Sequence, residues 1–78
     1  MNNKRRSEIK AIALQLEELR DKVEDLQREE QDAFDAMPES LQGGDRGDTS
    51  QAAADMLGEA YSSIDEAINQ LGEAAGEE

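Results

Sequence analysis

Carboxylates are the side chains through which this 78-residue chain could do chemistry. Asp and Glu contribute 20 residues against 8 Lys and Arg, and the chain has neither His nor Cys. Thiol nucleophiles, imidazole bases, disulfides and the common zinc and haem ligands are therefore excluded. Paired carboxylates act as acid and base only in a cleft that shifts their pKa values. The helical pattern of the chain predicts a rod without such a cleft, so we expect no enzymatic activity, no cofactor and no metal.

The acidic residues are unevenly placed along the chain, whose net charge is −12. Residues 1–28 are close to neutral, whereas residues 29–78 hold a single basic residue, Arg46. An acidic surface repels nucleic acid and anionic membranes and attracts basic proteins, including those that hold nucleic acid. The alternative is a charged surface that only confers solubility, or a halophilic origin. The candidate partner-binding residues of the acidic surface are Glu29, Glu30, Asp32, Asp35, Asp55, Glu59, Asp65 and Glu66.

One basic cluster, at the start of the chain, comprises Lys4, Arg5, Arg6 and Lys10. Its simplest role is to face the acidic C-terminus, because both groups oppose the dipole of their own helix and would offset that penalty in a hairpin. The C-terminal carboxylates concerned are Glu73, Glu77 and Glu78. The alternative is that dimer symmetry brings the basic clusters together to hold an anionic nucleotide.

Two heptad repeats predict the helices that position these charges. In the second half, the d positions are Leu57, Ile64 and Leu71, the a positions are Tyr61, Ile68 and Ala75, and alanine fills every g position. In the first half, the a positions are Ile9, Leu16, Val23, Glu30 and Met37, and the d positions are Ile12, Leu19, Leu26 and Ala33. The a and d positions of each helix are expected to form its apolar seam.

The boundaries follow from helix-breaking and capping residues. Asn2 or Asn3 can cap the first helix, which is predicted over about 4–36 and ends before Pro38. Residues 37–48 are predicted as a loop, with one short turn after Pro38 and glycine-rich linker chemistry at 43–47. The second helix is predicted over about 49–75, capped by Asp48 or Thr49. The fold class is all-α, a single antiparallel two-helix hairpin over 1–78.

A lone hairpin of this size buries too little apolar surface to be a strong domain. We therefore predict a homo-oligomer, most simply a dimer in which two hairpins form an antiparallel four-helix bundle. Two of the candidate contacts lie off the main seams and could instead be scattered surface hydrophobics, namely Leu14 and Met56. The full set of self-association candidates is Leu14, Met56, Tyr61, Ile64, Ile68 and Leu71.

Three further patterns are weak or negative. The segment from Asp45 to Asp55 lacks the alternating ligands and the bidentate Glu of a calcium loop. The Arg46-Gly47-Asp48 tripeptide, which cell-surface receptors read in exposed loops, is best explained by coincidence in a chain rich in Gly and Asp. No apolar run approaches the roughly 18 residues that span a bilayer, and no signal-peptide block follows the basic start. These patterns predict a soluble, cytoplasmic protein.

Several segments together resemble small acidic proteins of tailed bacteriophages and prophages. They are Asn3-Lys4-Arg5-Arg6, the run from Glu29 to Gln42 that contains Ala-Phe-Asp-Ala-Met-Pro-Glu-Ser-Leu-Gln, Arg46-Gly47 and the Glu-Ala repeats. The resemblance implies a helical hairpin in the host cytoplasm and carries no catalytic residues. The double glycine at 43–44 departs from the charged residues expected there.

The phage context favours a non-enzymatic inhibitor that blocks a host enzyme. The first hypothesis is that the acidic surface mimics nucleic acid and binds a basic, nucleic-acid-handling or defence enzyme of the host. The second is an oligomer that sequesters an anionic nucleotide through the basic cluster. The third is a structural or assembly helper. Neither direct nucleic-acid binding nor membrane binding is expected.

Overall fold

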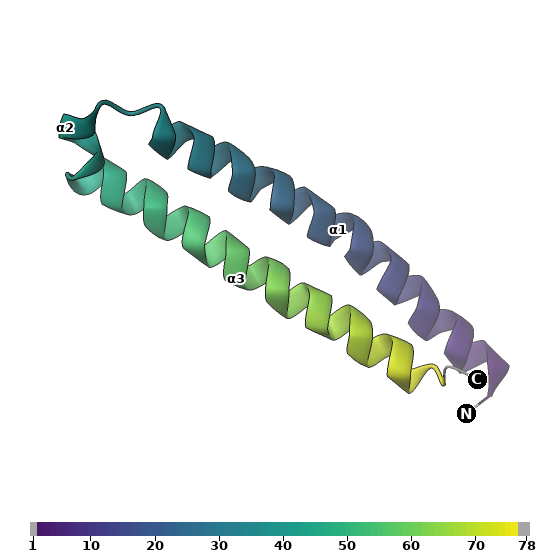
Figure 1. The fold of residues 1–78 in the computed structure, drawn as a ribbon. Coiled ribbons are helices and arrows are strands. Elements are labelled where there is room, and N and C mark those ends of the chain that lie inside the picture. Colours follow the sequence, from purple (N-terminus) through teal and green to yellow (C-terminus); the bar gives the residue numbers. More distant parts are fainter. Residues whose placement is uncertain (1, 77–78) are drawn as a thin grey trace.

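The fold is a long helical hairpin, seen in a computed structural model that describes residues 2–76. Helix α1 (Asn3–Asp35) and helix α3 (Asp45–Ala74) lie side by side and run in opposite directions, and the short α2 (Glu39–Gln42) closes one end (Figure 1). The Cα atoms extend over 59 × 15 × 14 Å. Residues 2–76 contain no strand, so the predicted all-α hairpin is confirmed.

The ends of α1 follow the predicted chemistry. The Asn2 side chain accepts a hydrogen bond of 2.7 Å from the backbone N–H of Arg5, which satisfies one of the amides left open in the first turn. At the other end, the Ala36 N–H donates to the carbonyl of Asp32 and closes the last turn. Pro38 follows in an extended conformation (ψ 147°) and stops the helix. Both observed ends lie within one residue of the predicted ones.

The start of α3 differs from the prediction. The helix begins at Asp45, so four residues predicted as loop, 45–48, form its first turn, and neither Asp48 nor Thr49 is the cap. Gly44 occupies the cap position in an extended conformation, and its carbonyl accepts a 2.9 Å hydrogen bond from the Asp48 N–H. Asp45 and Asp48 instead place negative charge in the first turn, where the helix dipole favours it.

Helix α1 packs against α3 through its a and e positions and not, as predicted, through its a and d positions. Most half-buried positions of α1 are a residues or the e residues Ala13, Arg20, Gln27 and Phe34, with Arg6, Glu17 and Gln31 in addition. The d residues are turned outward: Ile12, Leu19 and Leu26 are 49%, 50% and 52% exposed. The rotation accompanies polar contacts along the e positions, where Arg20 meets Asp65 and Gln27 lies against Gly58.

The hairpin has a thin interior. Among the described residues, the only buried apolar side chains are Ala54 and Ala75, and no large side chain is fully buried. The remaining apolar residues of the seam are half-buried at best. A large apolar side chain contributes about 1.5 to 3 kcal/mol only when it is removed from water completely. The isolated hairpin therefore leaves much of its hydrophobic stabilisation unused.

Candidate functional site

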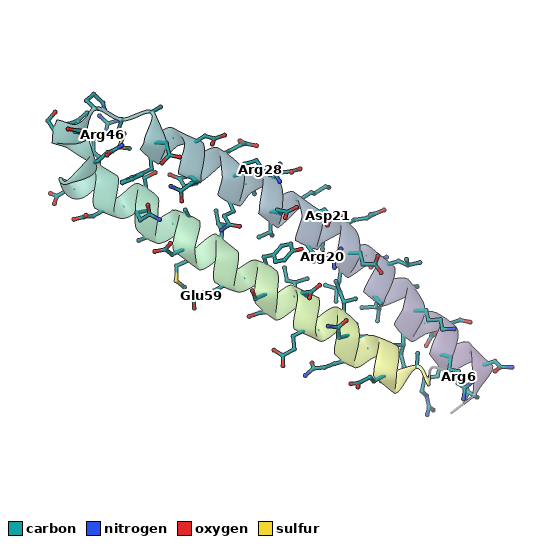
Figure 2. All side chains as sticks on the ribbon, viewed as in Figure 1. Arg6, Arg20, Asp21, Arg28, Arg46 and Glu59 are labelled. Carbon is teal, nitrogen blue, oxygen red and sulfur yellow. The ribbon has the colours of Figure 1, made fainter. Side chains whose placement is uncertain are left out.

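A charged and aromatic contact joins the middle of the two long helices (Figure 2). Arg20 Nη1 donates a 2.8 Å hydrogen bond to Asp65 Oδ1, and Arg20 Nε donates one of 3.3 Å to Asp21 Oδ1. The guanidinium carbon lies 5.8 Å from the centroid of the Tyr61 ring, within the range of a cation–π contact. This contact fixes the register of the antiparallel pair at its centre.

The same contact affects the protonation of the Arg20 guanidinium. The hydrogen bond to Asp65 is the main cause that raises the pKa of Arg20 above its ordinary value, and partial desolvation opposes it. A raised pKa stabilises the fold at every pH below the ordinary value of arginine, and this contribution is lost only as pH rises through the raised value. The contact therefore persists across the physiological range.

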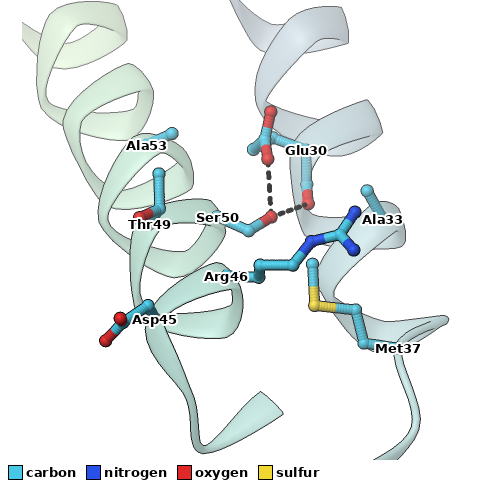
Figure 3. A pocket seen from close by; sticks show the side chains of 8 residues that line it. All are labelled: Glu30, Ala33, Met37, Asp45, Arg46, Thr49, Ser50 and Ala53. Atoms are coloured by element: carbon cyan, nitrogen blue, oxygen red, sulfur yellow. Dashed lines mark hydrogen bonds between the residues drawn. The ribbon is translucent and has the colours of Figure 1, made fainter. Parts of the chain in front are cut away.

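A second polar contact lies at the closed end of the hairpin (Figure 3). The buried Ser50 hydroxyl donates to the Glu30 side chain at 2.5 Å and lies 3.4 Å from the Glu30 backbone carbonyl. An open groove of about 430 Å³ adjoins this contact, and Arg46 reaches across it toward Met37. Its other lining residues are Ala33, Asp45, Thr49 and Ala53. The carboxylate of Glu30, the charged a residue of α1, is thus hydrogen-bonded within the hairpin.

The carboxylates of α3 are confined to one side of that helix. Its acidic residues all fall at heptad positions b, e and f, and Asp65 at e is held by Arg20. We call the exposed remainder the acidic face: Asp45, Asp48, Asp55, Glu59, Glu66 and Glu73. Figure 2 shows Glu59 on the side of α3 away from α1. A shallow hollow of about 690 Å³ beside this face is lined by Gln27, Asp55, Gly58, Glu59, Ser62 and Ser63.

The eight predicted acidic residues do not gather on a single face. Asp55, Glu59 and Glu66 lie together on the acidic face, whereas Glu30 and Asp65 are engaged within the hairpin. The exposed side chains of Glu29, Asp32 and Asp35 occupy positions g, c and f, which are spread around α1. Of the eight predicted residues, only Asp55, Glu59 and Glu66 of α3 therefore share one exposed side, and the Asp55 carboxylate also accepts a 3.1 Å hydrogen bond from Gln51 Nε2.

The basic cluster is spread around the first two turns of α1. Lys4, Arg5 and Lys10 are exposed at three different heptad positions, and Arg6 is half-buried. The Arg6 guanidinium lies against Gly76, where an added Cβ would be 3.4 Å from Nη2, and its buried Nε has no hydrogen-bond partner among the described residues. The C-terminal helix end thus reaches the basic cluster, as predicted. Of its three expected partners, Glu73 is exposed and forms no ion pair with the described part of the cluster, and Glu77 and Glu78 lie outside the described residues. Binding of an anionic nucleotide stays a prediction.

The six predicted self-association residues fall into three groups. Tyr61 and Ile68 occupy a positions in the seam between α1 and α3. Ile64 and Leu71 are half-buried at the edge of that seam. Leu14 and Met56 are 63% and 61% exposed, and their heptad positions, f and c, place them on opposite sides of the hairpin.

A second face, which the sequence analysis did not single out, lies opposite the acidic face. From Thr49 to Ala74, the c, d and g positions of α3 contain no charged residue, although the chain carries −12. Three outward d residues of α1, which are Ile12, Leu19 and Leu26, lie beside this side of α3. We call these residues together the uncharged face. On α3 it comprises Leu57, Ile64, Leu71, Ala53, Ala60, Ala67, Ala74, Thr49, Ser50, Met56, Ser63 and Gln70. The signal was available in the sequence as the restriction of acidic residues to b, e and f.

Within residues 2–76, no helix is both long enough and apolar enough to cross a bilayer. No three potential ligand side chains in the same range come close enough together to hold a metal ion.

No protein-family model, characterised protein or solved structure matches this chain at a significant level.

Proposed function

We propose that this protein is a non-enzymatic binding protein that engages a basic, nucleic-acid-handling protein through its acidic face and thereby competes with nucleic acid. The observation that carries the proposal is the one-sided row of exposed carboxylates on α3. Among the described residues, ion pairs involve only two cations, Arg20 and Arg28, and neither pairs with a carboxylate of the acidic face. The negative potential of that face is therefore not neutralised from within.

The geometry of the rod supports an interaction of this kind. A net charge of −12 over a length of 59 Å is about one charge per 5 Å of axis, and two chains side by side carry about one per 2.5 Å. Duplex DNA carries about one per 1.7 Å. A rigid row of like charges at this density raises the association rate with a basic groove and weakens as salt screens it. The resemblance to phage proteins makes a host enzyme the expected partner.

The experiment is affinity capture from bacterial lysate with the immobilised protein, followed by mass spectrometry of the bound fraction. We expect basic nucleic-acid-binding proteins that are released by added duplex DNA or RNA, and by about 0.5 M salt because screening then acts within a few ångströms. A variant that neutralises the acidic face, Asp55→Asn/Glu59→Gln/Glu66→Gln, should lose the captured proteins.

The matched control changes the same number of charges on exposed residues of α1, away from the acidic face, as Glu8→Gln/Glu18→Gln/Asp25→Asn. It should retain the captured proteins. If only the number of charges mattered, both triple variants would lose the captured proteins alike. Capture that survives high salt and excess nucleic acid, or that is equal for the two triple variants, would rule out binding by charge mimicry.

A further inference from the structure

We infer that a second copy of this chain docks on the uncharged face, so that two hairpins form a four-helix bundle with both acidic faces outside. This inference is carried by residues other than those of the acidic face and does not depend on the proposed function. It also assigns the interface to a specific side of the hairpin, which excludes Leu14 from it and leaves Tyr61 and Ile68 within each hairpin.

The register of the hairpin builds this face in layers. The contacts of Arg20 with Asp65 and of Gln27 with Gly58 fix which turns of α1 and α3 are level. Because both helices repeat every seven residues, the outward d residues of α1 then lie level with the d residues of α3. The three layers pair Ile12 with Leu71, Leu19 with Ile64, and Leu26 with Leu57. Each layer is open on the same side.

The alanines beside these layers allow a second hairpin to come close. Ala53, Ala60 and Ala67 recur at g positions of α3 and are half-buried, so no large side chain separates α3 from an incoming helix. Helix axes approach to about 8 Å when the residues between them are small. The exposed Met56 flanks the same alanines and offers a flexible apolar contact.

The size of the face matches that of a stable dimer interface. Between Thr49 and Gln70, α3 extends about 32 Å at 1.5 Å per residue. With two helices side by side, each about 10 Å wide, the face covers about 640 Å² on one copy. Two copies would bury about 1,300 Å² together, within the range of specific interfaces. A weak crystal-type contact would be smaller and less apolar.

Charge identifies the occupant as another copy of this chain. Two bodies of net charge −12 repel, so a self-contact is favourable only where neither copy presents carboxylates. The c, d and g side of α3 meets this condition from Thr49 to Ala74, whereas its b, e and f side carries every acidic residue of that helix. On α1, the c and g positions that border the outward d residues carry Glu18, Lys22, Asp25 and Glu29, so the contact centres on α3. Docking here also completes the interior, because it covers the leucines that the single hairpin leaves half-exposed.

The test compares two pairs of matched variants by sedimentation equilibrium, with helicity followed by circular dichroism. The first pair places Glu at a leucine of α1, on the face (Leu19→Glu) or off it (Leu14→Glu). The second places Glu at an alanine of α3, on the face (Ala60→Glu) or off it (Ala52→Glu). We expect the wild type to be dimeric at about 10 µM and the two on-face variants to raise the dimer dissociation constant at least about tenfold. The off-face variants should change it by less than about threefold.

A milder substitution keeps the test informative if an on-face glutamate unfolds the chain. The natural sequence has no Cys, so Ala60→Cys and Ala52→Cys each introduce a single reporter thiol. Alkylation of Cys at position 60 should slow at least about tenfold as protein concentration rises through the dimer dissociation constant, whereas position 52 should react at a constant rate. A monomeric wild type at about 100 µM, or equal protection at the two positions, would overturn the inference.

Discussion

At the scale of single residues, two glycines of α3 have opposite roles. A Cβ at Gly47 would collide with the backbone of Gln42, which cannot move without displacing α2. A Cβ at Gly58 would meet only the amide end of the Gln27 side chain, at 2.8 Å, and that end can rotate away. The first glycine is required by packing, and the second is a helix residue of low propensity that tolerates replacement.

We therefore predict that Gly47→Ala lowers the free energy of unfolding by about 1 to 3 kcal/mol, the usual range for overpacking. Gly58→Ala should leave it unchanged or raise it by up to about 1 kcal/mol, the helix-propensity gain of Ala over Gly. Urea unfolding of both variants at one protein concentration measures the difference. Equal effects in the same direction would show that the contact with Gln42 does not constrain position 47.

The role of Gly47 also shows what residue-level patterns miss. Gly43, Gly44 and Gly47 together are typical of a linker, so the sequence pattern predicts a loop where the first turn of α3 lies. The distinguishing fact is that Gly47 is buried against α2, and local composition contains no information about that close approach. Arg46-Gly47-Asp48 therefore lies in the first turn of α3 and not in an exposed loop. Its glycine allows close packing against Gln42.

At the scale of elements, the seam of α1 contains one charged a residue that the structure explains. Glu30 lies where the heptad calls for an apolar side chain, and the Ser50 hydroxyl of α3 donates to its carboxylate. Removing one partner of a half-buried polar pair leaves the other unsatisfied, whereas replacing both by apolar residues of suitable shape does not.

We predict that Ser50→Ala alone lowers the free energy of unfolding by about 1 kcal/mol. The double variant Glu30→Leu/Ser50→Ala should be at least as stable as the wild type, because it restores an apolar a position. Thermal and urea unfolding followed by circular dichroism check both. If the double variant is less stable than Ser50→Ala, the pair contributes more than satisfaction of its own polar groups.

The elements themselves were largely predictable, whereas their rotation was not. The heptads, Asn2 and Pro38 located α1 and its ends, since periodicity and capping are local properties. The outward turn of Ile12, Leu19 and Leu26 depends on Arg20 and Gln27 finding partners on α3, and such contacts join residues far apart in the chain. A heptad pattern identifies the apolar a and d positions, but it does not show which of them packs against the other helix of the hairpin.

At the scale of the whole molecule, the two faces should respond to salt in opposite directions. Contact through the uncharged face brings two bodies of −12 together, so screening should strengthen it. Contact of the acidic face with a basic protein gains from attraction, so the same screening should weaken it.

We predict that raising salt from about 0.02 to about 0.3 M lowers the dimer dissociation constant and raises the dissociation constant for the captured basic protein, as the Debye length falls. Sedimentation equilibrium measures the first and calorimetry the second.

A decoy with matched charge but no mimicry, such as polyglutamate, should not displace the captured protein at equal charge concentration. Parallel shifts of the two constants would contradict the separation of the faces.

The distribution of carboxylates over the surface of the hairpin was predictable only in part. The sequence led to an antiparallel hairpin and to acidic candidates on both helices, yet only Asp55, Glu59 and Glu66 of those candidates lie together on one exposed side. Heptad positions predict the one-sided placement on α3, but which carboxylates have internal partners depends on contacts between residues far apart in the chain.

The start of α1 and the finish of α3 lie at the same end of the hairpin, where Arg6 lies against Gly76. A tensile load applied across residues 2 and 76 would therefore act on a single layer of contacts at a time, opening the hairpin as a zipper from that end toward α2. Such a peeling geometry yields at far lower force than shear along the whole length would, so the rod resists this direction of pulling only weakly.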